Sequence, residues 1–273
     1  MPLTFTLQKP SSIPLEVDSV KLETVREQSV DGVKATLIQR GNKQVTLGEF
    51  FDVTGSAADD ETLIWEGDCS KIKLIGSHLS SGTVRVEGNA GMHLGAEMTG
   101  GEIIVDGDAG DWVGAEMHGG RIQVKGNAGH LIGAVYRGGR KGMTGGEILI
   151  DGDAGNEVGH AMRRGLIAVG GRAGDAAGVA MIAGTIVIAG ETGIRYGMGM
   201  KRGSIVLLGD NPPDMLPTFK HSGTYHPTIM RVLLRHLEAS GWSCPVGCLD
   251  AAYHRYHGDF LELGKGEILT RVA

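Results

Sequence analysis

The chain has 273 residues, including 46 glycines and only 3 cysteines, and its formal net charge at pH 7 is -6. This charge gives no support for a nucleic-acid or membrane-surface partner, and an odd, small number of cysteines excludes a disulfide framework. The glycines recur at a fixed period among isoleucine and valine, which excludes both a disordered glycine tract and collagen.

Residues 1–60 have the composition of a small globular segment. The first twelve residues lack a continuous apolar run, so we expect no signal peptide, and no stretch approaches the roughly 18 apolar residues of a membrane span. Few cysteines and no targeting signal favour the cytoplasm. Alternating apolar residues predict a strand over 3–7, a second over 33–38, and a strand or short connector over 45–51.

A 19-residue repeat fills residues 61–210, with a degenerate first copy at 62–68. Its pattern is G-x-[IV]-x-[IVL]-x-G-x-A-G-x-x-x-G-x-x-M-x-x, and the spacing is 19 residues except for one step of 26, which marks a seven-residue insertion. The regular repeats begin at Gly82, Gly101, Gly120, Gly146, Gly165, Gly184 and Gly203. A period near twenty is typical of a solenoid, in which stacked repeats share one core.

Three apolar columns recur in the repeats and predict the interior of a coil. The first alternates along a strand, as in Ile103 and Val105; the second contains Val113, and the third contains Met117. Glycines at fixed places allow the sharp corners that so short a turn needs. We therefore predict an all-β fold, a right-handed parallel β-helix of about seven 19-residue rungs.

Residues 211–273 leave the pattern and form a predicted C-terminal extension. Apolar residues at helical spacing predict one helix over 228–239, ended by Ser240 and Gly241, and a strand-like tail follows over 260–269. We expect this extension to cap or flank the last rung, because the open end of a coil exposes unpaired backbone groups.

Several features suggest a ligand but have a structural alternative. The glycine-rich loops lack the P-loop pattern and precede more strand, so corners explain them. Stacked acidic turns suggest calcium, but side chains that bond their own turn backbone explain them better; these are Asn89, Asp108, Asn127 and Asp153. Cys244 and Cys248, with nearby histidines at 221, 226, 254 and 257, are too loosely spaced for zinc, so we predict a packed loop and no metal.

Basic residues interrupt the repeat pattern in its second half. The insertion carries Arg137, Arg140 and Lys141, and later repeats carry Arg163-Arg164 and Lys201-Arg202 at matching places two rungs apart. This distribution indicates a cationic surface for an anionic ligand or partner, with ordinary solvated charge as the alternative. The sequence contains no nucleophile elbow, H-E-x-x-H motif or Ser-His-Asp order, so we predict no catalytic residue.

The repeats resemble a known family. Segments such as Gly107-Asp108-Ala109-Gly110-Asp111-Trp112-Val113-Gly114 are similar to the β-helix of the glutamate synthase large subunit and to the C subunit of formylmethanofuran dehydrogenase. The tail Gly264-Lys265-Gly266-Glu267-Ile268-Leu269 favours this C-subunit family over nearly the whole chain. Two assemblies contain such a subunit: an archaeal molybdenum or tungsten dehydrogenase, and the formyltransferase/hydrolase complex of methylotrophic bacteria. An excess of arginine over lysine and alanine-rich rungs favour the bacterial complex.

The resemblance implies a noncatalytic scaffold in the oxidation of formaldehyde to formate through tetrahydromethanopterin and methanofuran-type carriers. The implied partners are a zinc amidohydrolase-like subunit, a formyltransferase subunit and a dehydrogenase-like B subunit. No covalently bound cofactor is expected, but the carrier's polyglutamate tail is a polyanion that basic residues would hold. The residues that we expect to hold it are Arg137, Arg140, Lys141, Arg163, Arg164 and Arg202.

Two other functions stay open at this point. A stand-alone β-helix enzyme would need a concentrated set of singular catalytic residues, whereas His93, His118, His130 and His160 occupy different repeat positions. A glutamate-synthase-like module would separate two active sites, but the extra C-terminal segment argues against it.

Overall fold

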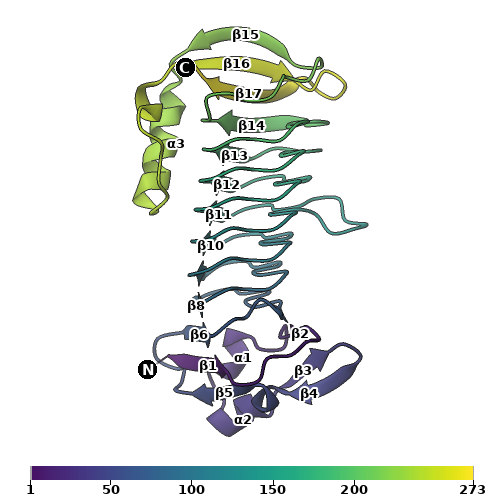
Figure 1. Cartoon of the computed structure of the whole chain (residues 1–273), viewed down its shortest axis with the longest axis vertical. Helices are drawn as coiled ribbons and strands as arrows, with labels where there is room; N and C mark the ends of the chain where they lie inside the picture. The colour runs from purple at the N-terminus through teal and green to yellow at the C-terminus, as the bar shows by residue number, and fades with distance from the viewer. Residues whose placement is uncertain (1, 273) are drawn as a thin grey trace.

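The structure, a computed structural model, describes residues 2–272 and is dominated by a tall stack of strands (Figure 1). Successive repeats contribute one strand each, and each strand pairs in parallel with the next one along the chain. These strands are β6 (Thr62–Glu66), β8 (Thr83–Glu87), β9 (Glu102–Val105), β10 (Arg121–Val124), β11 (Glu147–Ile150), β12 (Leu166–Val169), β13 (Thr185–Ile188) and β14 (Arg202–Leu207). The predicted, largely β fold is confirmed.

The register follows the sequence repeat. Ile103 of β9 pairs with Ile122 of β10, 19 residues later, and Ile122 pairs with Ile148 of β11 across the longer step. The seven inserted residues are therefore expelled from the stack rather than absorbed by it. A second line of bridges joins Ala90, Ala109 and Ala128 in the same parallel sense.

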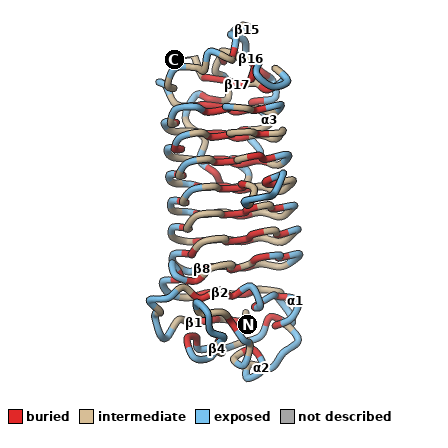
Figure 2. The backbone as a smooth tube through the Cα atoms, turned by 90° about the vertical axis from the view of Figure 1, so that its right-hand side faces the viewer, coloured by how far each residue is buried: buried red, intermediate tan, exposed pale blue. Residues whose placement is uncertain are grey.

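The three predicted apolar columns lie inside the turns and form one continuous core (Figure 2). Ile103, Val113 and Met117 each have 0% exposure. Glycine is needed beside this core as well as at its corners. A Cβ atom on Gly114, whose φ is +61°, would lie 2.5 Å from Cδ1 of Ile148 in the following turn. The close stacking of isoleucine over glycine thus explains why the glycine recurs in register.

The Asn and Asp ladder joins successive turns. The Oδ1 atom of Asn89 accepts a hydrogen bond from the amide of Asp108 (2.9 Å), and Asp108 accepts one from Asn127 (2.7 Å). Asn127 accepts in turn from Asp153 (2.8 Å). The expectation that these side chains bond their own turn is wrong, because stacking in register brings the amide of the next repeat within reach.

Removing one member of this ladder is expected to weaken the stack measurably. Asp108→Ala leaves the Asn127 amide without its acceptor and should lower the free energy of unfolding by about 1 kcal/mol. Asp108→Asn keeps an Oδ1 acceptor, as Asn89 and Asn127 do, and should stay within about 0.5 kcal/mol of the parent. Urea denaturation of the pair tests this, and equal losses would show that the ladder bond contributes nothing.

The N-terminal segment closes one end of the coil. Strand β1 (Leu3–Leu7) pairs in parallel with β6 and antiparallel with β5 (Phe51–Thr54), and Phe5 stacks on Trp65 with ring centroids 4.4 Å apart. The predicted strand over 3–7 is confirmed. The remaining elements of this end are β2 (Leu15–Glu16), α1 (Leu22–Val25), α2 (Val30–Lys34), β3 (Leu37–Arg40), β4 (Lys43–Thr46), a 3₁₀ turn (Leu47–Glu49) and β7 (Ile72–Lys73).

The single strand predicted over 33–38 is wrong. The Ser29 hydroxyl accepts a hydrogen bond from the Gly32 amide and caps α2, so Val33 is buried from a helix and β3 begins only at Leu37. The segment 45–51 is divided in the same way between β4, the 3₁₀ turn and β5. A local side-chain cap overrides the alternating pattern here.

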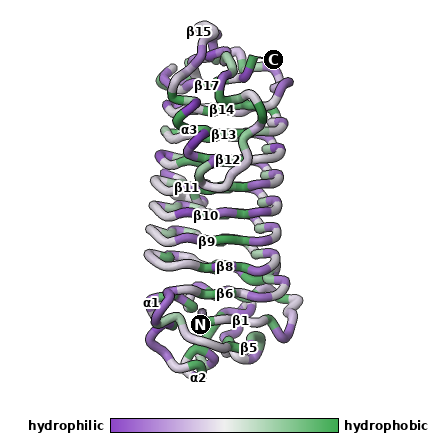
Figure 3. The backbone as a smooth tube through the Cα atoms, turned by 90° about the vertical axis from the view of Figure 1, so that its left-hand side faces the viewer, coloured by the Kyte–Doolittle hydropathy of each residue, from purple (hydrophilic) through white to green (hydrophobic). Residues whose placement is uncertain are grey.

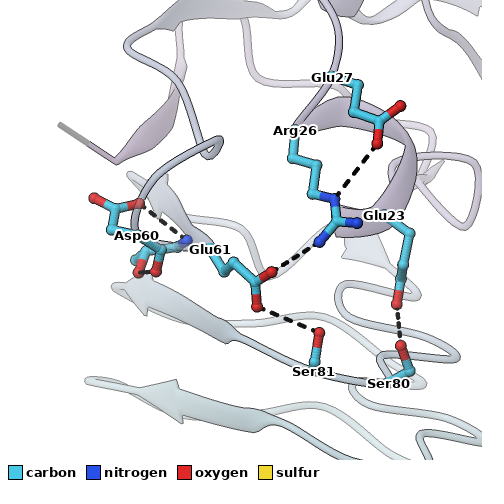
Figure 4. Close-up of polar contacts among 8 residues, drawn as sticks. Glu23, Arg26, Glu27, Asp60, Glu61, Ser80 and Ser81 are labelled. Atoms are coloured by element: carbon cyan, nitrogen blue, oxygen red, sulfur yellow. Dashed lines mark hydrogen bonds and ion pairs between the residues drawn. The ribbon is translucent and has the colours of Figure 1, made fainter.

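Polar contacts fasten this N-terminal segment to the first turns of the coil (Figure 4). Arg26 donates to a carboxylate oxygen of Glu61 at 2.8 Å, and the Ser81 hydroxyl donates to the other at 3.4 Å. The Ser80 hydroxyl donates to Glu23 of α1. Side chains from residues 23–26 thus reach the loop that precedes β8.

The C-terminal extension continues the long sheet and then turns back along it. Strand β17 (Lys265–Arg271) pairs in parallel with β14, and β16 (Tyr253–Gly258) and β15 (Lys220–Tyr225) follow antiparallel. The predicted tail over 260–269 is partly wrong, because residues 260–264 form a turn whose Glu262 and Gly264 amides bond the Asp259 carbonyl. A 3₁₀ turn spans Cys248–Asp250.

Helix α3 (Thr228–Ala239) has the predicted bounds and lies against the outer face of the sheet (Figure 3). It forms a second core with outward-facing residues of the later strands. This core contains Leu149, Ala168, Val187 and Val206 from the sheet, and Met230, Leu234, Leu237 and Trp242 from the extension. Within the described part of the chain, no helix is long and apolar enough to cross a bilayer.

Candidate ligand-binding site

The seven-residue insertion forms an arm on the side of the coil opposite α3 (Figure 1). The Val135 amide donates to the His160 carbonyl at 3.2 Å, and the Gly142 amide donates to the Ala161 carbonyl at 3.0 Å. Both ends of the arm are therefore fixed to the next turn. Between them, the arm exposes three of the predicted cations, which are Arg137, Arg140 and Lys141.

A second group of cations surrounds a shallow cavity of about 270 Å³ near the C-terminal end of the coil. We call it the basic cavity; its lining residues are Arg163, Arg164, Lys201, Arg202, Ile182, Ala183 and Leu263. The two basic pairs face one space because they occupy matching positions two repeats apart, or roughly 10 Å along the stack. Lys201 Nζ lies 3.9 Å from a Glu262 carboxylate oxygen.

Most of the charge around the basic cavity is not neutralised internally. Within residues 2–272, no carboxylate forms an ion pair with Arg163, Arg164 or Arg202, and all three side chains are exposed. Exposed cations concentrated in this way attract carboxylates or phosphates, and salt screens the attraction. The arrangement suits an extended polyanion better than a single small anion.

The structure separates the six predicted residues into groups. It brings Arg163, Arg164 and Arg202 together in the basic cavity and adds Lys201 to them. Arg137 lines a different cavity, whereas Arg140 and Lys141 lie on the arm and line neither of these two.

This other space, the aromatic cavity, measures about 390 Å³ and lies between the arm and the coil. It is lined by Trp112, Leu131, Val135, Tyr136, Arg137, Gly138, Gly139, Glu157 and His160. The Trp112 and Tyr136 rings stack with centroids 5.0 Å apart and planes 25° apart. Sequence reasoning missed both rings, although Trp112 is the only tryptophan in the regular repeats and Tyr136 begins the insertion.

Tyr136 is held by polar contacts on both sides. Its amide donates to a Glu116 carboxylate oxygen at 2.9 Å, and its hydroxyl lies 2.9 Å from Nδ1 of His93. Burial lowers the pKa of His93, and burial, with the charges of Glu97 and Glu116, raises the pKa of Tyr136 to about 12. At neutral pH the phenol therefore donates to an uncharged imidazole, so the contact persists across the physiological range.

The region around Cys244 and Cys248 is a packed loop. Cys248 is buried and accepts a hydrogen bond from Arg271 at 3.4 Å, while the His254 ring contacts His221 and bonds Thr224. The described residues contain no group of three or more His, Cys, Asp or Glu side chains placed to hold a metal ion.

Comparisons with known proteins place this geometry in context. The chain matches the GXGXG motif family over residues 70–216. The C subunit of tungsten-containing formylmethanofuran dehydrogenase 2 from Methanothermobacter wolfeii is 38% identical over 96 residues, which cover 34% of this chain and 36% of the relative. The C subunit of molybdenum-containing formylmethanofuran dehydrogenase 1 from Methanothermobacter marburgensis is 40% identical over 83 residues, covering 30% and 21%. The chain thus spans about a third or less of the length of these curated relatives.

A solved structure matches over the full length. One chain in the crystal structure of the formyltransferase/hydrolase complex (FhcABCD) from Methylorubrum extorquens, in complex with methylofuran, superposes with a TM-score of 0.91. It is 32% identical, and the match covers 99% of this chain and 100% of that chain.

Proposed function

The chain belongs to the GXGXG motif family, and from that premise we propose that it is a noncatalytic scaffold subunit of a formyltransferase/hydrolase complex in one-carbon metabolism. The observation that carries the proposal is the match over 99% of the chain to a component of such a complex. The alternative, the C subunit of an archaeal molybdenum or tungsten dehydrogenase, is supported by alignments over about a third of this chain.

In this proposal the repeats form a right-handed parallel β-helix of about seven rungs, between an N-terminal segment (1–60) and a C-terminal extension (211–273). Interlocked core and ladder contacts make such a coil a stiff spacer, because every turn is fixed by its neighbours. Catalysis would belong to partner subunits: a zinc amidohydrolase-like subunit, a formyltransferase subunit and a dehydrogenase-like B subunit.

The basic cavity gives this scaffold a second role, which is to hold the polyglutamate tail of a methanofuran-type carrier. Its exposed cations lack internal partners, and the arm adds Arg137, Arg140 and Lys141 further along the coil. Several weak carboxylate contacts would retain a flexible tail and still allow it to slide. The apolar Ile182, Ala183 and Leu263 between the pairs would limit competition from water.

Purification tests the scaffold proposal. The chain expressed alone should show no formyl transfer or hydrolysis, whereas co-expression with its genomic neighbours should give a stable assembly of several different subunits with coupled activity. Turnover by the isolated chain, or its failure to associate with those neighbours, would reject the proposal.

Charge reversal tests the tail-binding role. Arg202→Glu should weaken binding of a synthetic oligoglutamate peptide at low salt by roughly tenfold, since it removes one contact and adds a repulsive charge. Arg235→Glu makes the same charge change at an exposed position of α3 and should leave affinity within about twofold. Calorimetric titration of both variants decides the matter: equal affinities would mean that net charge, not the basic cavity, governs binding.

A further inference from the structure

The aromatic cavity is built from two layers that the repeat brings together. Its floor contains Trp112, Leu131 and Glu157, which occupy the same position in three successive turns, about 4.8 Å apart. All three have left-handed backbone conformations, with φ of +67°, +63° and +60°. The arm, from Val135 to Gly139, forms the opposing wall.

The aromatic end of this cavity is rigid before any ligand arrives. The Tyr136 ring is fixed by Trp112, by its hydroxyl contact to His93 and by its amide bond to Glu116. Beside the rings, Leu131 and Val135 add aliphatic surface. A preorganised aromatic and aliphatic wall favours a flat ring, because little side-chain entropy is lost on binding.

The charges at the cavity determine what the ring should carry. Glu157 already has a partner, since its carboxylate lies 2.9 Å from Nδ1 of His160. Arg137 is exposed, and no ion pair with it occurs in residues 2–272. The charge left without a partner is therefore positive, which favours an anionic substituent.

We propose that the aromatic cavity binds a small molecule that combines a flat ring with a carboxylate. The ring packs against Trp112 and Tyr136, and the carboxylate pairs with the Arg137 guanidinium. This site is separate from the basic cavity and does not depend on membership of a complex, so it stands or falls independently of the proposed function.

Intrinsic fluorescence offers a direct measurement. The chain has 3 tryptophans, and Trp65 and Trp242 are each only 1% exposed, so a ligand-dependent change reports on Trp112. Titration with N-benzoylglutamate should give a saturable change. Benzamide, which lacks the carboxylates, and N-acetylglutamate, which lacks the ring, should bind roughly tenfold more weakly. Benzylamine should also bind more weakly; tighter binding of this amine would overturn the assignment of an anionic ligand.

Two variants on the arm provide a matched pair. Arg137→Gln should weaken N-benzoylglutamate binding about fivefold and leave benzamide unchanged, because only the exposed charge contact is lost. Arg140→Gln makes the same change on the same arm but outside the cavity and should bind like the parent. Equal losses in both variants, or no saturable signal in the parent, would overturn the proposal.

A third variant tests the ring contact. Tyr136→Leu should weaken both N-benzoylglutamate and benzamide, yet leave oligoglutamate binding at the basic cavity unchanged. That last comparison separates failure of this site from failure of the tail-binding role. If this variant does not fold, the arginine pair still decides the question.

Discussion

Gly120→Ala is expected to lower the free energy of unfolding by about 3 kcal/mol or more, since two costs combine at one atom. Gly120 has a φ of +83°, which L-residues rarely adopt. A Cβ atom there would also lie 2.7 Å from both the carbonyl carbon and the oxygen of Gly100 in the preceding turn. Backbone atoms cannot rotate away as a side chain can, so the two turns would have to separate.

Gly138→Ala isolates the first of these costs. Gly138 has nearly the same φ, +86°, but lies on the arm, where a Cβ atom would have no neighbour within 4 Å. Its substitution should cost only about 1 kcal/mol. Chemical denaturation of the two variants measures the difference, and equal losses would show that turn-to-turn contact does not restrict Gly120.

The glycine at position 120 also shows why so much of the coil is predictable. A contact between turns recurs in every repeat, so the same constraint is recorded seven times, from Gly82 to Gly203. The methionine column is equally regular, and its members are buried. The α3 bounds are predictable for a different reason, namely a clear helical spacing followed by Ser240 and Gly241.

Features that occur once are harder to predict. A pattern of alternating apolar residues does not show that Ser29 caps a helix, so the pattern predicts a strand where α2 forms. The ladder from Asn89 to Asp153 repeats, yet its bonds join residues 19 or 26 apart, a partner choice that only stacking determines. The aromatic cavity depends on how the arm folds back over Trp112, and the sequence carries no second copy to compare.

One signal for α3 is present in the sequence but needs the structure to interpret it. Outward-facing strand positions are polar in early turns, as at Arg85 and Gln123, and become apolar from Leu149 onward. The change coincides with the strands that α3 covers. The apolar outer positions therefore record a packing partner that lies about 80 residues away in the chain.

This packing makes Trp242→Ala the second large expected effect, a loss of about 3 to 5 kcal/mol. Trp242 is 1% exposed, and its indole Nε1 donates to the Ile150 carbonyl at 3.3 Å. It lies in the core that joins α3 to the outer face of β11 through Leu149 and Leu237. Truncation leaves a cavity there and removes the partner of a buried carbonyl.

The expected consequence is local release of α3 before the coil unfolds, because each turn of the coil is held mainly by its neighbours. Hydrogen exchange should therefore show faster exchange in residues 228–239 of Trp242→Ala, with β8 to β10 unchanged. Val232→Ala is the matched control, since Val232 lies on the same helix but is 62% exposed, and it should change stability by less than about 0.5 kcal/mol. Uniformly faster exchange along the coil would instead mean that α3 stabilises the whole stack.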